Sequence, residues 1–158
     1  VRFDAWSKAN SLFSEGDAHE LSHNDESFDT ILSFETLEHL NDPEKALKSF
    51  HRVCKKNIVI TVPNCTLTDG MQESRLIFYH WIDRTHINFW NTESLQSLVE
   101  KCGFTVRRVE LINKIALGPL VVEALCIPKF LRGFTSKVFS VLARKKYPMT
   151  ILLVAEKI

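Results

Sequence analysis

Apolar strands alternate with capped amphipathic helices through most of the chain, and this alternation limits the fold more than any other feature of the sequence. Short runs of mainly apolar and β-branched residues predict strands over 28–34, 57–62, 104–112 and 150–156. Strands that are separated by helices usually lie side by side in the same direction. The chain is therefore predicted to be an α/β protein with a largely parallel sheet.

Capping residues mark the predicted helices. Asp42, followed directly by a proline, is typical of a helix N-terminus. Asn91 or Thr92 is expected to cap a second helix, and Gly103 to end it. Residues 115–147 are apolar with interspersed basic residues, so we expect a helical insertion before the last strand.

Length and composition are those of one globular domain, which we place over residues 1–158. A chain of 158 residues that is 45% hydrophobic can bury a core without disulfides. The formal net charge of +1 gives no overall field that would attract nucleic acid. The four cysteines lie far apart without CxxC spacing, which indicates reduced thiols and a cytoplasmic location.

Polar residues follow several of the apolar segments. In open α/β sheets, ligands bind at the carboxyl ends of the strands, so Asp4, residues 16–18 and residues 33–39 are candidate ligand contacts. Carboxylates in such positions accept hydrogen bonds from hydroxyl or amine groups. Asp17 as a simple turn residue and Asp4 as a solvated acid remain equally compatible with the spacing.

Four segments carry a family resemblance, over about residues 4–112. They are GDAHEL (16–21), SFDTILSFETLEHLNDPEKAL (27–47), FHRVCKKNIVITVPN (50–64) and HINFWNTESLQSLVEKCGF (86–104). Together they resemble the class I S-adenosylmethionine-dependent methyltransferases, and most closely the type 11 group that contains quinone-biosynthesis O-methyltransferases. The resemblance implies a Rossmann-like sheet, mostly parallel with an antiparallel closing strand, and S-adenosylmethionine as cofactor.

The resemblance also implies roles for individual residues in holding the cofactor. Asp17 matches the acid that accepts a hydrogen bond from the adenine amine, and the Ala18 backbone faces the adenine ring. Asp4 matches the acid that binds the ribose hydroxyls. Ser33, Phe34 and Glu35 match the strand end that approaches the methionine part and the methyl group.

The resemblance places Glu35, Glu38 and His39 at the mouth between cofactor and acceptor, and we expect Glu35, His39 and His86 to be the catalytic residues. The cluster of glutamate and histidine residues favours an O-methyl transfer. His39 or His86 would act as general base. With Glu38, these residues also resemble the metal-binding arrangement of the small-RNA 2′-O-methyltransferases. The alternative is that Glu38 and His39 only shape the turn before the helix, without a metal.

The sequence departs from the family at one important point. None of its five glycines forms the glycine-rich turn that cradles the cofactor after the first strand of the family. The chain therefore looks like the C-terminal portion of a methyltransferase that lacks its first βα unit. The alternative is a non-catalytic binding or scaffold module, and in either case an open strand edge would favour oligomers.

Two further segments bear on partners. Aromatic residues at 78–81, with Phe89 and Trp90, either form a pocket for a flat acceptor or cap the sheet edge. Residues 129–146 carry six basic residues and no acid, so they form either a basic amphipathic helix that touches a membrane surface or a helix with a solvated face. A small-molecule or lipid-like acceptor is the expected partner, rather than a nucleic acid.

Overall fold

The computed structural model describes residues 13–67, 69–74, 83–115, 122, 125–142 and 147–158. Its elements are β1 (Phe28–Phe34), the 3-10 turn η1 (Leu37–His39), α2 (Pro43–Val53), β2 (Cys54–Pro63), α3 (Asp69–Ser74), α4 (Thr92–Lys101), β3 (Phe104–Ile115), α6 (Arg132–Leu142) and β4 (Tyr147–Lys157). The four predicted strands and the two capped helices are all present. The ligand contact predicted at Asp4 lies outside the described residues.

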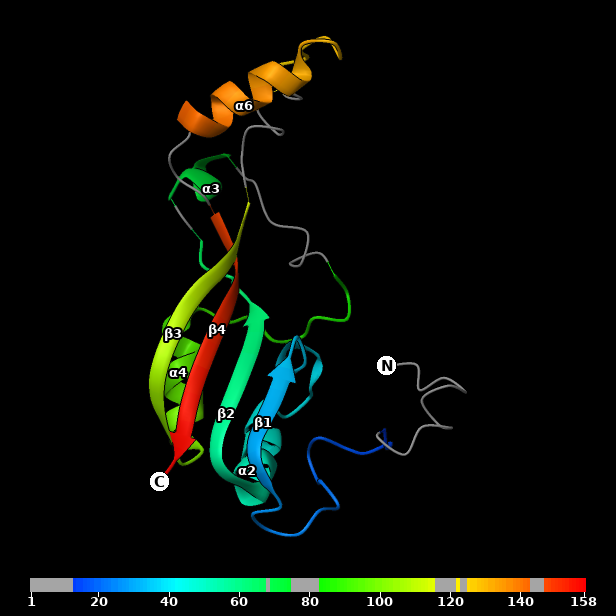
Figure 1. Cartoon of the computed structure of the whole chain (residues 1–158), viewed down its shortest axis with the longest axis vertical. Helices are drawn as coiled ribbons and strands as arrows, with labels where there is room; N and C mark the ends of the chain where they lie inside the picture. Colours follow the sequence, from blue (N-terminus) through cyan, green and yellow to red (C-terminus); the bar gives the residue numbers. More distant parts are fainter. Residues whose placement is uncertain (1–12, 68, 75–82, 116–121, 123–124, 143–146) are drawn as a thin grey trace.

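The four strands form one sheet in the order β1-β2-β4-β3 (Figure 1). β1 pairs with β2 in parallel, with Ile31 opposite Ile58. β4 runs antiparallel to both of its neighbours, β2 and β3. β1, β2 and β3 therefore share one direction, and the prediction of a mostly parallel sheet with an antiparallel closing strand is confirmed.

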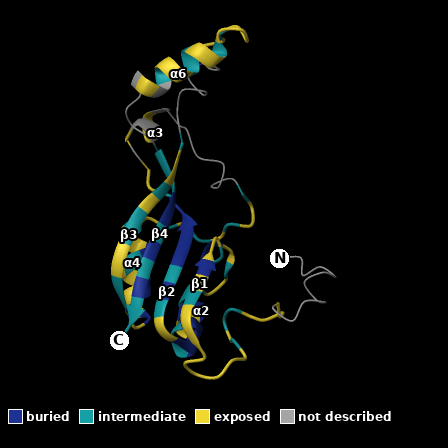
Figure 2. Cartoon of the chain, in the orientation of Figure 1, coloured by how far each residue is buried: buried dark blue, intermediate teal, exposed yellow. Residues whose placement is uncertain are grey.

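The core lies between the sheet and two helices, α2 and α4, which cover the same face of it (Figure 1). The fully buried apolar side chains come from η1, α2, β2, α4 and β4, and include Leu47, Ile58, Ile60, Leu95 and Leu153. Figure 2 shows that burial is concentrated on β2 and β4, while β1 and β3 are more exposed. The two central strands thus hold the sheet to the helices.

The predicted caps are present. The Asp42 side chain accepts a hydrogen bond from the Lys45 backbone N–H at 2.8 Å, and Asn91 accepts one from the Ser94 N–H at 2.7 Å. Such caps satisfy N–H groups that the first helical turn leaves without partners. Gly103 follows α4 with a φ of +95°, a left-handed conformation that favours glycine.

An ion-pair network joins the two helices. One Glu44 carboxylate oxygen accepts a hydrogen bond from Lys48, and the other accepts one from Lys101, both at 2.7 Å. These two hydrogen bonds lower the pKa of Glu44 to about 2. Glu44, near the start of α2, thereby ties that helix to the end of α4.

Glu44→Gln is expected to lower stability at neutral pH but not in acid. The folded-state pKa of Glu44 lies below its ordinary value of 4.5, so its stabilising effect is complete above that value and is lost as pH falls toward about 2. Urea unfolding of both proteins between about pH 7 and pH 3 measures the effect. A difference in stability that stays constant over this range would contradict the assignment.

Two apolar surfaces lie outside the core. On β1, Leu32 and Phe34 are 61% and 54% exposed. α6 lies beyond the carboxyl end of β2 rather than against the face of the sheet (Figure 1), and its segment exposes Phe130 and Phe134. Within the described part of the chain, no helix has the length and apolar character needed to cross a membrane.

Candidate functional site

The site begins where β1 ends. Glu35, directly after the strand, has a φ of +46°, which is uncommon for a residue with a side chain. Its N–H donates to the backbone oxygen of Thr61 at 2.9 Å and to the Thr61 hydroxyl at 3.2 Å. Backbone strain of this kind is often found at functional sites, where the surrounding structure maintains it. Here β2 holds the turn that leads into η1.

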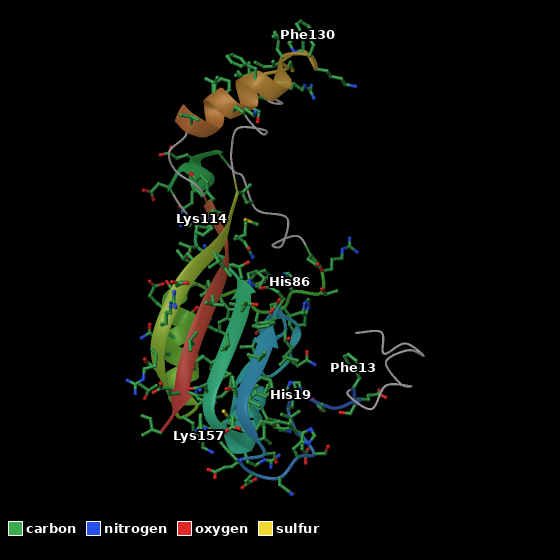
Figure 3. The ribbon with its side chains drawn as sticks, in the orientation of Figure 1. Phe13, His19, His86, Lys114, Phe130 and Lys157 are labelled. Carbon is green, nitrogen blue, oxygen red and sulfur yellow. The ribbon has the colours of Figure 1, made fainter. Side chains whose placement is uncertain are left out.

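A distant loop is fixed to this turn by backbone hydrogen bonds. The N–H groups of Ile87 and Asn88 both donate to the Glu38 carbonyl, at 2.9 and 3.1 Å. The Asn88 side chain donates to the carbonyls of Leu37 and Leu40. These four hydrogen bonds place His86 beyond the carboxyl ends of β1 and β2, as Figure 3 shows.

Three predicted site residues converge there. Glu38, His39 and His86 each offer one ligand atom, and these atoms lie within 4.8 Å of one another. The two imidazole rings pack edge to face with centroids 4.7 Å apart. Glu35, also predicted for this site, does not belong to this group, and its side chain is exposed whereas that of Glu38 is buried.

Glu38 is the most unusual member of the group. Its side chain is 1% exposed, and neither carboxylate oxygen accepts a hydrogen bond from another described residue. Burial raises the pKa of Glu38, and the nearby charge of Glu35 raises it further. A buried carboxylate without such partners is costly and calls for a functional explanation.

The orientation of His39 follows from its hydrogen bond to the loop. His39 Nδ1 lies 3.0 Å from the backbone oxygen of Thr85. Because a carbonyl only accepts hydrogen bonds, Nδ1 carries a proton, so in the neutral imidazole the lone pair is on Nε2. Nε2 is also the atom that lies 3.8 Å from Glu38 Oε1. A basic nitrogen therefore lies beside the buried carboxylate.

The Asp17 loop lies against the residues that follow this turn. Asp17 Oδ1 is 2.7 Å from His19 Nδ1 and accepts the His19 backbone N–H at 2.9 Å. His19 Nε2 in turn accepts the Asp42 N–H at 3.4 Å, just before α2. The hydrogen bonds from His19 lower the pKa of Asp17, so its exposed side chain remains a charged acceptor.

The other predicted contacts have varied environments. Ser33 is buried, with no hydrogen-bond partner for its hydroxyl among the described residues, and Phe34 is exposed. Ala18 packs against the core. Of the aromatic residues, Phe89 is exposed and Trp90 packs against the core, while residues 78–81 lie outside the described residues.

Three residues of the site were not identified from the sequence. Asp83 Oδ2 lies 3.9 Å from His86 Nε2, Thr85 orients His39, and Asn88 fixes the loop. The available signal was the turn chemistry of Asp83 and Thr85, in which the Asp83 side chain accepts the Thr85 N–H and hydroxyl. That signal predicts a turn at Asp83 and Thr85, but it does not predict that this turn lies beside His39.

A family model described as "Methyltransferase domain" matches residues 3–109, about two thirds of the chain. No curated protein sequence matches significantly.

Solved structures give the same fold. A S-adenosylmethionine-dependent methyltransferase from Archaeoglobus fulgidus is 22% identical with a TM-score of 0.62, over 92% of this chain and 67% of that one. A methyltransferase structure from Bacillus halodurans has 16% identity and a TM-score of 0.60, over 92% and 71%. The magnesium protoporphyrin IX methyltransferase of Synechocystis PCC 6803, with bound S-adenosylhomocysteine, has 10% identity and a TM-score of 0.54, over 92% and 51%.

This chain thus spans between about half and 71% of the length of these three structures. At such identities the similarity to these structures shows only the fold, whereas the match to the family model shows the family to which the chain belongs. The mixed four-strand sheet, shorter than that of its neighbours, agrees with both. The chain belongs to the methyltransferase-domain family, with the Rossmann-like fold of the class I S-adenosylmethionine-dependent enzymes.

Proposed function

We propose that this chain contributes the acceptor side of a S-adenosylmethionine-dependent O-methyltransferase. The observation that carries the proposal is the position of His39 Nε2, whose lone pair lies beside Glu38 and His86 at the carboxyl ends of β1 and β2. A basic group at this edge of the sheet suits an acceptor that must lose a proton.

The cofactor would be held by Asp17, with Ala18 beside it. The carboxylate of Asp17 is charged, exposed and oriented by His19, which are the properties required to accept a hydrogen bond from an amine. S-adenosylmethionine, when bound, supplies the methyl group on its sulfonium. The buried Ser33 and the turn at Glu35 lie where the family resemblance places the methionine part.

The chemistry requires little beyond positioning and one proton transfer. The acceptor oxygen would take the methyl group from the sulfonium of S-adenosylmethionine, which would leave as S-adenosylhomocysteine with the electron pair of the broken carbon–sulfur bond, so the chain's residues need to position the acceptor for this transfer. The hydroxyl proton passes to a basic nitrogen, His39 Nε2, and then to water. His86, 11% exposed and next to His39, would orient the acceptor.

The acceptor that we favour is a small or lipid-like hydroxyl compound. Exposed Phe89 near the site offers an apolar surface for such a molecule. The exposed Phe130 and Phe134 of the α6 segment, next to basic Lys129 and Lys137, suit contact with a membrane surface that presents the acceptor.

A non-catalytic scaffold is the alternative function. β1 exposes Leu32 and Phe34, which a binding partner could cover. A scaffold would bind a protein partner and have no need of the cofactor.

Calorimetric titration of S-adenosylhomocysteine distinguishes the two functions. It should be carried out on the 158-residue chain and on the gene product from its natural start. We expect the second to bind the cofactor product, and labelled methyl transfer can then be screened on phenols and lipid-like alcohols. Absence of binding to either protein would overturn the enzyme assignment in favour of the scaffold.

A further inference from the structure

Glu38, His39 and His86 have the composition of a metal site. One carboxylate and two imidazoles supply three ligand atoms within 4.8 Å of one another. Glu38 and His39 are neighbours in η1, and the fold brings His86 to them from a loop much later in the chain. This donor set suits divalent first-row transition metals.

The buried carboxylate is an independent indication of a bound cation. Glu38 is 1% exposed, with no hydrogen bond from any other described residue to either oxygen. Its nearest basic group, His39 Nε2, is 3.8 Å from Oε1, beyond hydrogen-bonding distance. A cation between these atoms would give the carboxylate the partner that the protein does not provide.

His39 is oriented as metal-binding imidazoles usually are. Metal-binding imidazoles commonly donate their other N–H to a carbonyl or carboxylate, which fixes the ring and the tautomer. His39 Nδ1 makes this contact with the Thr85 carbonyl, which leaves Nε2 for a metal. Asp83 Oδ2, 3.9 Å from His86 Nε2, provides a second carboxylate at the edge of the group.

Hydrogen bonds hold the backbone around these ligands. The Glu38 carbonyl accepts two backbone N–H groups, and Asn88 binds the carbonyls on either side of the turn. A site in which supporting hydrogen bonds hold the ligands pays little to organise them on binding.

We propose that Glu38, His39 and His86 bind a divalent first-row transition-metal ion. The ion's part in catalysis rests on the proposed function: with three protein ligands, it would keep positions open for the acceptor oxygen and favour loss of its proton. His39 would then act as ligand, and the proton would leave to water. The binding itself does not depend on methyl transfer.

Titration with Co²⁺ tests the site directly, through the visible absorption that the metal gains when imidazoles coordinate it. We expect saturable binding by the wild-type chain that is at least roughly tenfold weaker in His39→Gln and in Glu38→Gln. Competition with Zn²⁺ or Mn²⁺ should remove the signal. His23→Gln is the matched control, because His23 is exposed and makes its ring contact with Phe28, outside the group.

Far-UV circular dichroism shows whether each variant is folded. Because His39→Gln and Glu38→Gln change different ligands, the test can still be read if one of the two variants does not fold. A wild-type chain that gives no Co²⁺ signal, or a signal equal in His39→Gln, Glu38→Gln and His23→Gln, would overturn the proposal. S-adenosylhomocysteine calorimetry is read independently. Cofactor binding without metal binding would overturn only the metal site, and metal binding without cofactor binding would overturn only the methyltransferase function.

Discussion

Replacing Asp17 by alanine is expected to weaken the binding of S-adenosylhomocysteine roughly 10- to 100-fold, the loss that follows removal of a hydrogen bond to a charged group. The structure gives this carboxylate the properties needed for such a bond. His19 fixes Oδ1 through two contacts and lowers the pKa of Asp17, while the side chain stays 68% exposed to an incoming ligand. Calorimetry on the gene product from its natural start measures the change.

The matched control is Asp29→Ala. Asp29 is an equally exposed acid, but it lies at the opposite end of β1, where it pairs with Lys56 at 3.0 Å. We expect the control to bind S-adenosylhomocysteine like the wild type. Equal affinities for wild type, Asp17→Ala and Asp29→Ala would remove Asp17 from the cofactor site. Equal loss in both variants would indicate that net charge, rather than one hydrogen bond, controls the affinity.

The elements that the sequence predicted best are those with local signals. The strand over 28–34 and the caps at Asp42 and Asn91 are present as predicted, because periodicity and capping chemistry act over a few residues. β2 begins at Cys54 rather than at residue 57, since α2 passes into extended backbone at Cys54 without a connecting loop. No turn residue marked that boundary.

The sequence indicated some residues of the site but not its geometry. The resemblance identified His39 and His86, yet their contact depends on backbone hydrogen bonds from the later loop to the Glu38 carbonyl. Such bonds involve atoms that every residue has, so they leave no pattern in the sequence. For the same reason, nothing in the sequence indicated that Glu38 would be buried and Glu35 exposed within one short turn.

Replacing Glu38 by methionine is expected to stabilise the metal-free protein by about 1–3 kcal/mol, because an apolar side chain of similar length removes the cost of a buried polar group without partners. Most substitutions of a buried residue destabilise a protein. A gain would therefore show that Glu38 is kept for function at the expense of stability. Urea unfolding in the presence of a chelator measures the difference.

Glu35→Met is the control, since it makes the same change three residues away at an exposed position and should alter stability by less than about 0.5 kcal/mol.

Adding Zn²⁺ should then make the wild type more stable than Glu38→Met. At a free concentration about 100 times the dissociation constant, a ligand that binds only the folded state stabilises it by about 2.7 kcal/mol. Wild type should gain this stability, and Glu38→Met should not. A destabilised Glu38→Met that still responds to Zn²⁺ would mean that Glu38 has a structural role and that the metal, if bound, is held elsewhere.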